Sequence, residues 1–282
     1  MGTLLLVATP IGNLGDLTPR AVEAFAAADL VCCEDTRRSG RLLQHAGVTA
    51  RRLRRVDDHT EHAATVEVLE VLNAGGTVAV VTDAGTPGIS DPGQRLVRAA
   101  IEAGHAVSAV PGPAALVMAL VISGMSTDRF VFEGFLPRSG RERAERVGEI
   151  STQRSTSILY EAPHRVARTV ADLAVACGPE RRVALCRELT KLHEEVWRGT
   201  LGEAANHLSE REPIGEFVVV LDGAPVAAPT TDDEVSALLR RAVSGGMSKR
   251  DAAAHVAAQT GRPKRDVYNL ALSLTLTLPS AF

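Results

Sequence analysis

The 282-residue sequence has few aromatic side chains and almost no excess of charge of one sign. Aromatic residues make up 3% of the chain, which leaves little material for a platform that stacks several unpaired bases. The 31 Lys and Arg side chains nearly balance the 34 Asp and Glu side chains, so the net charge is -3. Binding to a nucleic acid would therefore require a local concentration of positive charge.

Cysteine is also scarce, and its spacing is not that of a metal site. The four cysteines, Cys32, Cys33, Cys177 and Cys186, contain no C-x-x-C pair, which predicts a reducing compartment and no structural metal. The N-terminus lacks the basic and long apolar regions of a secretory signal. Prolines interrupt the longest apolar stretch, residues 106–124. We therefore expect a cytoplasmic protein without a membrane segment.

The common phosphate-binding and nucleophile motifs are absent as well. Neither G-x-G-x-x-G nor G-x-x-x-x-G-K-[ST] occurs, which disfavours a dinucleotide or a nucleoside triphosphate as the ligand. No nucleophile elbow is present, so covalent catalysis is disfavoured.

Apolar runs of strand length alternate with helical patterns along most of the chain. Strands are expected at residues 3–8, 30–33, 77–82 and 106–110, with helices at 17–28, 94–103 and 114–122. This alternation predicts βαβ units and a largely parallel sheet that is buried on both faces. The pattern restarts with strands at 130–136, 156–160, 182–188, 195–199 and 216–221 and helices at 141–152, 165–176 and 201–208. The fold class is therefore α/β, with domains at residues 1–122 and 123–225 and a linker near 123–129.

The last part of the chain has a different composition. Residues 225–229 resemble a tether, and helices are expected at 232–243, 248–260 and 265–274, with Ser248 as an N-cap. Two helices joined by a Gly-containing turn are typical of a helix-turn-helix, so residues 230–282 are predicted to form a small helical domain. Its seven basic and five acidic side chains are equally compatible with a domain that only packs.

Three loops rich in Gly and Pro follow predicted strands, at residues 9–16, 83–93 and 111–113. Ligands of open α/β sheets bind at the carboxyl ends of the strands, and glycines there let the backbone approach a ligand. Any one of these loops could be an ordinary βα turn, but three together favour a binding site. The polar side chains Asp83, Ser90 and Asp91 are explained at least as well by capping and turn hydrogen bonds.

One charge run stands out. Residues 37–55 hold seven arginines and no acid, a local charge of +7. Arginine clusters suit phosphate oxygens, although a solvated surface is the alternative. Residues 138–154 hold five arginines, but Glu142, Glu145 and Glu149 are interleaved, which is typical of a salt-bridged helix.

Several motifs then indicate a family. The segments at residues 7–17, 34–37, 83–93, 111–113, 160–165, 187–191 and 215–217 resemble, in the same order, the ribosomal RNA small-subunit methyltransferases of the tetrapyrrole methylase superfamily. The helical tail resembles the C-terminal helix-turn-helix of the same enzymes. Thr86 stands where related corrin enzymes have an aspartate, which argues against a porphyrinoid substrate.

The resemblance implies an S-adenosylmethionine-dependent enzyme that methylates the ribose 2′-hydroxyl of a cytidine in the decoding region of 16S rRNA. It also implies a cofactor cleft between two α/β domains, a homodimer, the 30S subunit as the substrate particle, and no binding to DNA. By this resemblance the cofactor-binding residues are Pro10, Gly85, Thr86, Ile89, Ala114, Ala115, Tyr160, Cys186 and Gly215.

The candidate catalytic residues are two carboxylates and a lysine. A ribose hydroxyl is a poor nucleophile while protonated, so we expect Asp35 or Glu161 to act as general base and Lys191 to orient or polarise the acceptor. The predicted RNA-binding residues are Arg37, Arg38, Arg41, Arg51, Arg52, Arg54, Arg55, Lys249, Lys264 and Arg265.

Two other functions remain open at this point. A methyltransferase for a small, tetrapyrrole-like molecule would share the fold and the cofactor but would leave the arginine run unused. A regulator that senses a ligand and reads DNA through its tail would bind duplex DNA without transferring a methyl group.

Overall fold

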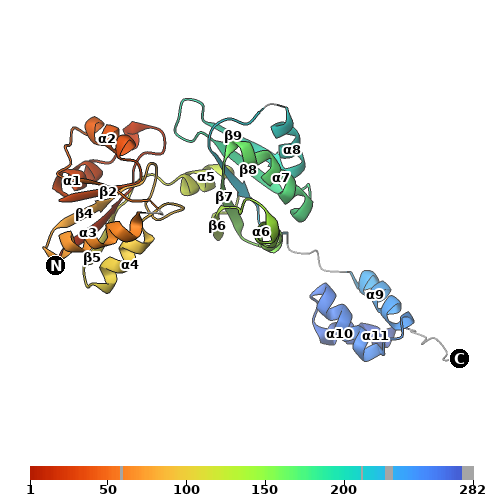
Figure 1. Ribbon diagram of the computed structural model, residues 1–282. Helices are drawn as coiled ribbons and strands as arrows, with labels where there is room; N and C mark the ends of the chain where they lie inside the picture. Colours follow the sequence, from red (N-terminus) through yellow and green to blue (C-terminus); the bar gives the residue numbers. More distant parts are fainter. Residues whose placement is uncertain (58–59, 211, 226–230, 275–282) are drawn as a thin grey trace. The chain divides into compact units, whose positions relative to one another are not determined.

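The computed structural model describes residues 1–57, 60–210, 212–225 and 231–274. The chain divides into two compact units, Met1–Ala224 and Pro225–Phe282 (Figure 1). Residues 226–229 of the predicted tether, together with residue 230 and residues 275–282 of the predicted tail domain, lie outside the described residues. Within the described ranges, no helix has the length and apolar character needed to cross a membrane.

The first sheet is entirely parallel, as the sequence predicts. Its strands are β1 (Thr3–Val7), β2 (Leu30–Cys33), β3 (Leu53–Arg55), β4 (Thr77–Val80) and β5 (Ala106–Val110), in the order β3-β2-β4-β1-β5. The helices that connect them are α1 (Pro19–Ala27), α2 (Thr36–His45), α3 (Glu61–Asn73) and α4 (Gln94–Glu102). Because all the strands run the same way, the loops at their carboxyl ends gather at one edge.

Helices bury both faces of this sheet. Phe25 of α1 packs with Val7 on one face, and Val68 of α3 and Leu96 of α4 pack with Leu4 on the other. This burial on two sides explains why the strands consist of continuous apolar runs.

Three elements of this half were not predicted, namely α2, β3 and α3. Only Ser39 and Leu43 of α2 are buried, and two of the three residues of β3 are exposed. Elements with so few buried apolar positions leave no clear periodicity in the sequence. The helix α3 differs, because Ala64, Val68 and Leu72 are buried at helical spacing, a signal from which it could have been predicted.

The second sheet is mostly antiparallel. Its strands are β6 (Phe130–Phe135), β7 (Thr156–Glu161), β8 (Arg182–Arg187), β9 (Glu195–Thr200) and β10 (Phe217–Leu221), in the order β6-β7-β10-β8-β9. β6 and β7 pair in parallel, and the other three neighbouring pairs are antiparallel. The alternation of strands and helices had not indicated these directions. Residues 188–194 join β8 to β9 without a helix, and such a connection makes neighbouring strands antiparallel.

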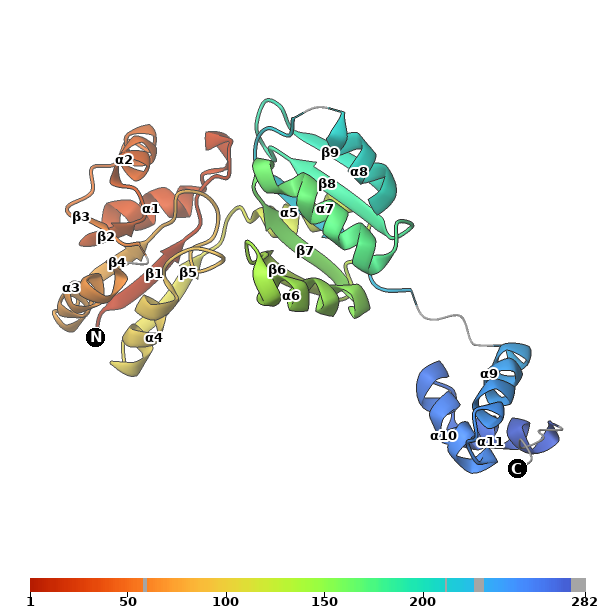
Figure 2. The same ribbon diagram turned by 45° about the vertical axis from the view of Figure 1, so that its right-hand side comes forward.

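Helices cover both faces of the second sheet as well (Figure 2). The helices α6 (Gly140–Thr152), α7 (Pro163–Cys177) and α8 (Leu201–Ser209) lie on one face. Leu116 and Leu120 of α5 (Ala115–Ser123) pack on the other face, against Ile158 and Val220. Although α5 ends at the domain boundary expected near residue 122, it therefore contributes to the core of the second sheet.

The second unit contains α9 (Asp232–Ser244), α10 (Lys249–Thr260) and α11 (Lys264–Ser273), which match the three predicted helices. They share an apolar core that includes Val235, Val256 and Val267. Ser248 caps α10 as predicted, since its hydroxyl accepts a hydrogen bond from the Asp251 N–H at 3.1 Å. Gly261 ends α10 with a φ of +68°, a conformation that favours glycine.

Candidate active site

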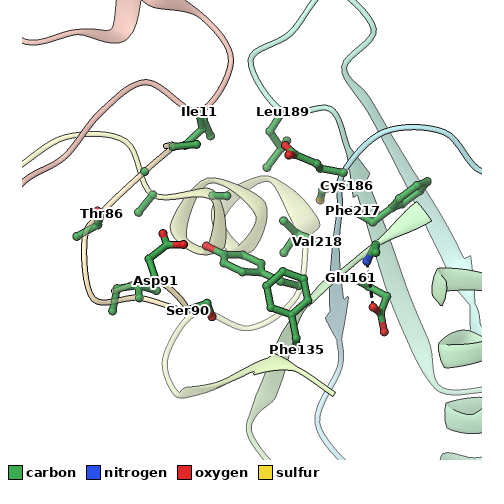
Figure 3. A pocket seen from close by; sticks show the side chains of 18 of the residues that line it. Ile11, Thr86, Ser90, Asp91, Phe135, Glu161, Cys186, Leu189, Phe217 and Val218 are labelled. Atoms are coloured by element: carbon green, nitrogen blue, oxygen red, sulfur yellow. Dashed lines mark hydrogen bonds between the residues drawn. The ribbon is translucent and has the colours of Figure 1, made fainter. Parts of the chain in front are cut away.

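A cavity of about 440 Å³ lies in the first unit where loops of both sheets meet (Figure 3). The first half of the chain contributes Ile11, residues 84–86, 89–91, and 114–115 at the start of α5. The second sheet contributes residues 160–163, Cys186, Leu189 and 216–218. A cavity of this volume is in the range that holds a small ligand.

The loops of the first sheet form one wall of this cavity. Thr9 and Gly85 exchange two backbone hydrogen bonds, of 2.9 Å and 3.1 Å, and the Thr86 hydroxyl donates to the Pro113 carbonyl at 3.2 Å. Gly85 has a φ of +85°, which favours glycine at this position. The loops after β1, β4 and β5 are thus tied together and bring their backbone groups to the cavity.

Backbone strain is concentrated around the same cavity. Among the described residues, the non-glycine residues with positive φ are Ser90 at 61°, Glu188 at 52° and Thr190 at 66°. Ser90 lines the cavity, and Glu188 and Thr190 flank Leu189, which also lines it. Such conformations are costly and cluster at functional sites, so this pattern independently points to the cavity.

Seven of the nine predicted cofactor-binding residues line the cavity. They are Gly85, Thr86, Ile89, Ala114, Ala115, Tyr160 and Cys186. Pro10 and Gly215 do not, although their neighbours Ile11 and Glu216 do.

Gly215 allows a close approach of two loops. Its φ is +89°, and a Cβ atom added there would lie 2.5 Å from Cγ of Glu188. Glu188 in turn accepts a hydrogen bond from the Glu216 N–H at 2.9 Å. The glycine therefore fixes how the loop after β8 sits against the start of β10.

Tyr160 connects the second sheet to the start of α5. Its hydroxyl oxygen accepts a hydrogen bond from the Leu116 N–H at 3.1 Å, and its ring makes edge contacts with Phe132 and Phe135. Burial raises the pKa of this phenol. The hydroxyl therefore stays protonated near neutral pH and keeps a proton to donate.

Asp91 is a candidate that the sequence analysis assigned to turn formation. It lines the cavity, and Figure 3 shows its carboxylate directed into it. Burial, together with the nearby carboxylates Glu34 and Asp83, raises the pKa of Asp91 to about 6, while a hydrogen bond with Thr82 opposes the shift. The sequence signal was its place in the loop at residues 83–93, which also contains Asp83, whereas Glu34 comes from the end of another strand, β2.

Asp35 caps α2 and does not line the cavity. Its carboxylate accepts hydrogen bonds from the N–H groups of Arg37 and Arg38, and it pairs with the Arg37 guanidinium at 3.1 Å. The hydrogen bond from the Arg37 side chain is the main cause that lowers the pKa of Asp35 to about 2. A carboxylate with so low a pKa is a weak base.

Glu161 lines the cavity, but its carboxylate has partners in the protein. It accepts hydrogen bonds from the Thr169 hydroxyl at 2.6 Å and the Ala162 N–H at 3.0 Å, and it pairs with Arg165 at 3.2 Å. The carboxylate points away from Asp91 (Figure 3). These contacts fix the start of α7.

Lys191 bridges two acidic side chains at the rim. Its ammonium group contacts Glu188 Oε1 at 2.8 Å and Glu216 Oε2 at 2.9 Å. A Cβ atom added to Gly12, in the loop after β1, would overlap Cγ of Lys191. Lys191 therefore links the loop after β8 to the segment just before β10. Its partner Glu216 also lines the cavity.

The fold supplies acids to most of the arginine run. Arg51 pairs with Asp29, Arg52 and Arg54 pair with Glu67, and Arg55 pairs with Asp57. Arg37 and Arg38 pair with Asp35 and Asp83. The local charge of +7 seen in the sequence is therefore largely compensated in space, by acids that lie outside the run.

The arginines of α2 are the part of this run that borders open concavities. Arg38 and Arg41 line an open concavity of about 430 Å³ with Thr9, Pro10 and other residues, and Arg37 joins them in an adjacent one. Lys249, Lys264 and Arg265 belong to the second unit, where Lys264 and Arg265 are exposed at the start of α11.

The described part of the chain contains no group of three or more metal-ligating side chains. Its four cysteines are free thiols, and burial raises the pKa of Cys186, which lines the cavity, to about 11. Cys186 therefore contributes an uncharged, largely apolar surface.

The comparisons with known proteins agree with this geometry. Residues 3–205 match the Tetrapyrrole (Corrin/Porphyrin) Methylases, and residues 229–275 match the RsmI C-terminal HTH domain. The chain is 48% identical to ribosomal RNA small subunit methyltransferase I of Synechocystis sp., over 97% of this chain and 99% of that protein. The protein of the same name from Halalkalibacterium halodurans is 40% identical, over 95% of this chain and 94% of that protein.

A solved structure has the same fold at low sequence identity. Uroporphyrin-III C-methyltransferase from Thermus thermophilus, complexed with S-adenyl homocysteine, superimposes with a TM-score of 0.56 at 16% identity. The match covers 79% of this chain and 97% of that one. The predicted α/β fold class with a helix-turn-helix tail is confirmed.

Proposed function

The chain belongs to the tetrapyrrole methylase family, in its ribosomal RNA small subunit methyltransferase I branch, and from that premise we propose what it methylates. It uses S-adenosylmethionine to methylate 16S rRNA, and the acceptor is the ribose 2′-hydroxyl of a cytidine in the decoding region. The observation that carries this proposal is the 48% identity over 97% of the chain, helical tail included. The working substrate is the 30S subunit in the cytoplasm.

The cavity fits the methyl donor. The tied backbone of the loops after β1, β4 and β5 supplies polar groups, and Ile11, Leu189 and Cys186 supply an apolar surface. We assign cofactor binding to the seven lining residues named above, and to Pro10 and Gly215 through the loops that they shape. The bound cofactor provides an activated methyl group on a sulfonium, and the protein must align the acceptor oxygen with it and exclude water.

The acceptor hydroxyl needs a group that takes its proton. Asp91 suits this role better than Asp35 or Glu161, because its carboxylate faces the cavity and its pKa is about 6. A base is most effective when its pKa lies near the working pH. Lys191 remains the proposed orienting group, acting through Glu216 at the rim.

RNA phosphates would be held at two places. The α2 arginines Arg37, Arg38 and Arg41 line open concavities beside the loop after β1. Lys249, Lys264 and Arg265 of the second unit would add further phosphate contacts. Arg37 and Arg38 are paired with acids as well, but Arg51, Arg52, Arg54 and Arg55 are both paired and absent from the lining of these two concavities, so we expect these four to contribute less than the sequence alone suggests.

A second copy of the chain is the proposed partner in solution. The helix α5 is apolar on all sides, and its outer side leaves Val117, Met118 and Val121 exposed at 46%, 39% and 59%. A helix with apolar residues on every side is normally buried, so a homodimer would cover this face.

The test uses 30S subunits from cells in which this gene is deleted, incubated with S-adenosylmethionine labelled in its methyl group. Nuclease digestion and mass spectrometry then map the label in the 16S rRNA. Label on one cytidine ribose supports the proposal, and label on a base would refute the assignment of the acceptor. Absence of label from the RNA, with label on an added tetrapyrrole, would favour the small-molecule alternative, and duplex DNA binding without transfer would favour the regulator.

A further inference from the structure

A further concavity, the basic hollow, has a volume of about 420 Å³, lies beside the start of α7 and is lined only by basic residues. Arg138 comes from the segment before α6, and Arg143 comes from α6 itself. His164, Arg165 and Arg168 come from the first turns of α7. Five basic residues from separate segments thus converge on one hollow.

The acids near this hollow compensate only part of its charge. Arg143 and Arg168 share Asp172, and Arg165 pairs with Glu161. Four guanidinium groups therefore face two carboxylates, which leaves a formal charge of 4 − 2 = +2. Among the described residues, Arg138 has no acidic partner. None of the acids lines the hollow itself, so an incoming anion would meet only positive or neutral groups.

The hollow is also preorganised. Arg143 is buried, and its guanidinium donates to Asp172 at 2.8 Å, to the Thr169 hydroxyl at 3.0 Å and to the Pro137 carbonyl at 3.0 Å. Arg168 donates to the Arg138 carbonyl at 3.4 Å, which ties the segment before α6 to α7. These contacts hold Arg143 and the segment before α6 in place against α7 without a ligand.

The structure also separates two kinds of arginine in the segment that the sequence analysis read as a salt-bridged helix. Arg141 pairs with Glu145, and Arg146 pairs with Glu149, as that reading predicts. Arg138 and Arg143 instead line the hollow. The run of arginines thus contains a convergent pair that its overall charge balance conceals.

Some residues that line the hollow come directly after residues that line the cavity in the sequence. Glu161, Ala162 and Pro163 line the cavity, and the next two residues, His164 and Arg165, line the hollow. Consecutive residues of one segment therefore line the two sites.

We propose that this basic hollow binds a backbone phosphate of the RNA strand whose reacting nucleotide enters the cavity. The inference rests on the proposed function and adds to it a phosphate site outside the arginine run of residues 37–55. Guanidinium groups bind phosphate oxygens in pairs of parallel hydrogen bonds, which suits a hollow formed by several arginines. Binding there would fix the strand on the second sheet's side of the cavity.

The test compares Arg138→Ala and the double variant Arg138→Ala/Arg168→Ala with Arg141→Ala. Arg141 is an exposed arginine three residues from Arg138 that does not line the hollow. The KM for unmethylated 30S subunits is measured between 50 and 200 mM salt, and a melting curve checks that each variant is folded. A lost phosphate contact weakens the salt dependence by about threefold over this range.

The expected result is a higher KM and a shallower salt dependence for the Arg138 variants, with S-adenosylhomocysteine affinity unchanged and Arg141→Ala like wild type. If the Arg138 variants keep the wild-type KM and salt slope while the wild type methylates 30S subunits, the phosphate site is refuted and the proposed function stands. If the wild type does not methylate RNA, the same slopes are measured by filter binding of 16S rRNA. A shallower salt dependence of 16S rRNA binding in the Arg138 variants would then support the phosphate site although the proposed function has failed. An unchanged salt dependence would refute the phosphate site as well.

Discussion

Replacing Asp91 by Asn removes a negative charge from the cavity while keeping the size of the side chain. If Asp91 accepts the proton of the attacking hydroxyl, Asp91→Asn loses a general base, a contribution worth on the order of 100-fold or more in turnover. The affinity for S-adenosylhomocysteine, measured by calorimetry, should remain close to that of the wild type, because the loop backbone that we assign to cofactor binding is unchanged.

The pH dependence gives the sign of the effect. With a pKa of about 6, Asp91 is ionised above that pH and protonated below it. Wild-type turnover on 30S subunits should therefore fall as the pH drops through 6 and be about tenfold lower at pH 5 than at pH 7. The Asp91→Asn variant should not show this fall in turnover, which is the acid limb of the pH profile. Asp83→Asn, which removes one of the repelling charges, should shift the acid limb to lower pH.

Asp91→Asn should lower the turnover but raise the stability of the protein. A carboxyl group whose pKa is raised by folding is destabilising when ionised, and this cost develops as the pH rises from about 4 to about 6. A shift of about two units corresponds to at most about 3 kcal/mol, and solvent screening at this half-buried site reduces it to about 1 kcal/mol. Asp91→Asn should therefore melt about 2 to 4 °C higher at pH 8.

The control for these measurements is Asp128→Asn, an exposed carboxylate that does not line the cavity. It should change neither the pH profile nor the melting temperature. Full turnover of Asp91→Asn at pH 8, or an unchanged acid limb in that variant, would refute the assignment of Asp91 as the base.

Three further outcomes follow from the site and its surroundings. Gly215→Ala forces a Cβ atom onto Glu188 at a φ of +89°, so we expect a loss of more than about 1 kcal/mol in unfolding free energy by denaturant titration. Tyr160→Phe deletes the hydroxyl that accepts an N–H of α5, so we expect a loss of about 1 kcal/mol and weaker S-adenosylhomocysteine binding by calorimetry. Val121→Glu places a charge on the exposed face of α5 and should give monomers in light scattering, whereas Val175→Glu, at an 89% exposed position on α7, should not.

Local sequence patterns were sufficient to predict much of the first sheet. β2 and β5 have the predicted bounds, because short apolar runs between turn residues are characteristic of buried parallel strands. The directions of the strands in the second sheet could not be predicted in this way. They depend on β10 inserting between β7 and β8, a pairing of residues far apart in the sequence.

In the site, too, some features could be predicted from neighbouring residues, and others depend on residues far apart in the sequence. The loop residues Gly85, Thr86 and Ile89 were predicted to bind the cofactor from a continuous motif, and they line the cavity. The raised pKa of Asp91 depends first on burial and then on Glu34, which is 57 positions away in the chain, and neither cause can be seen in the sequence around Asp91. The acids that compensate the arginine run, such as Glu67, are equally invisible until the chain is folded.

The position of α5 links two processes that are usually considered separately. Its first residues line the cavity, its inner side packs on the second sheet, and its outer side carries the exposed valines and Met118. If subunit association orders this helix, the dimer has already lost the conformational entropy that cofactor binding would otherwise have to remove. Thermodynamic reciprocity then requires that saturating cofactor tighten the dimer by the square of the factor by which dimerisation tightens cofactor binding at each of its two sites.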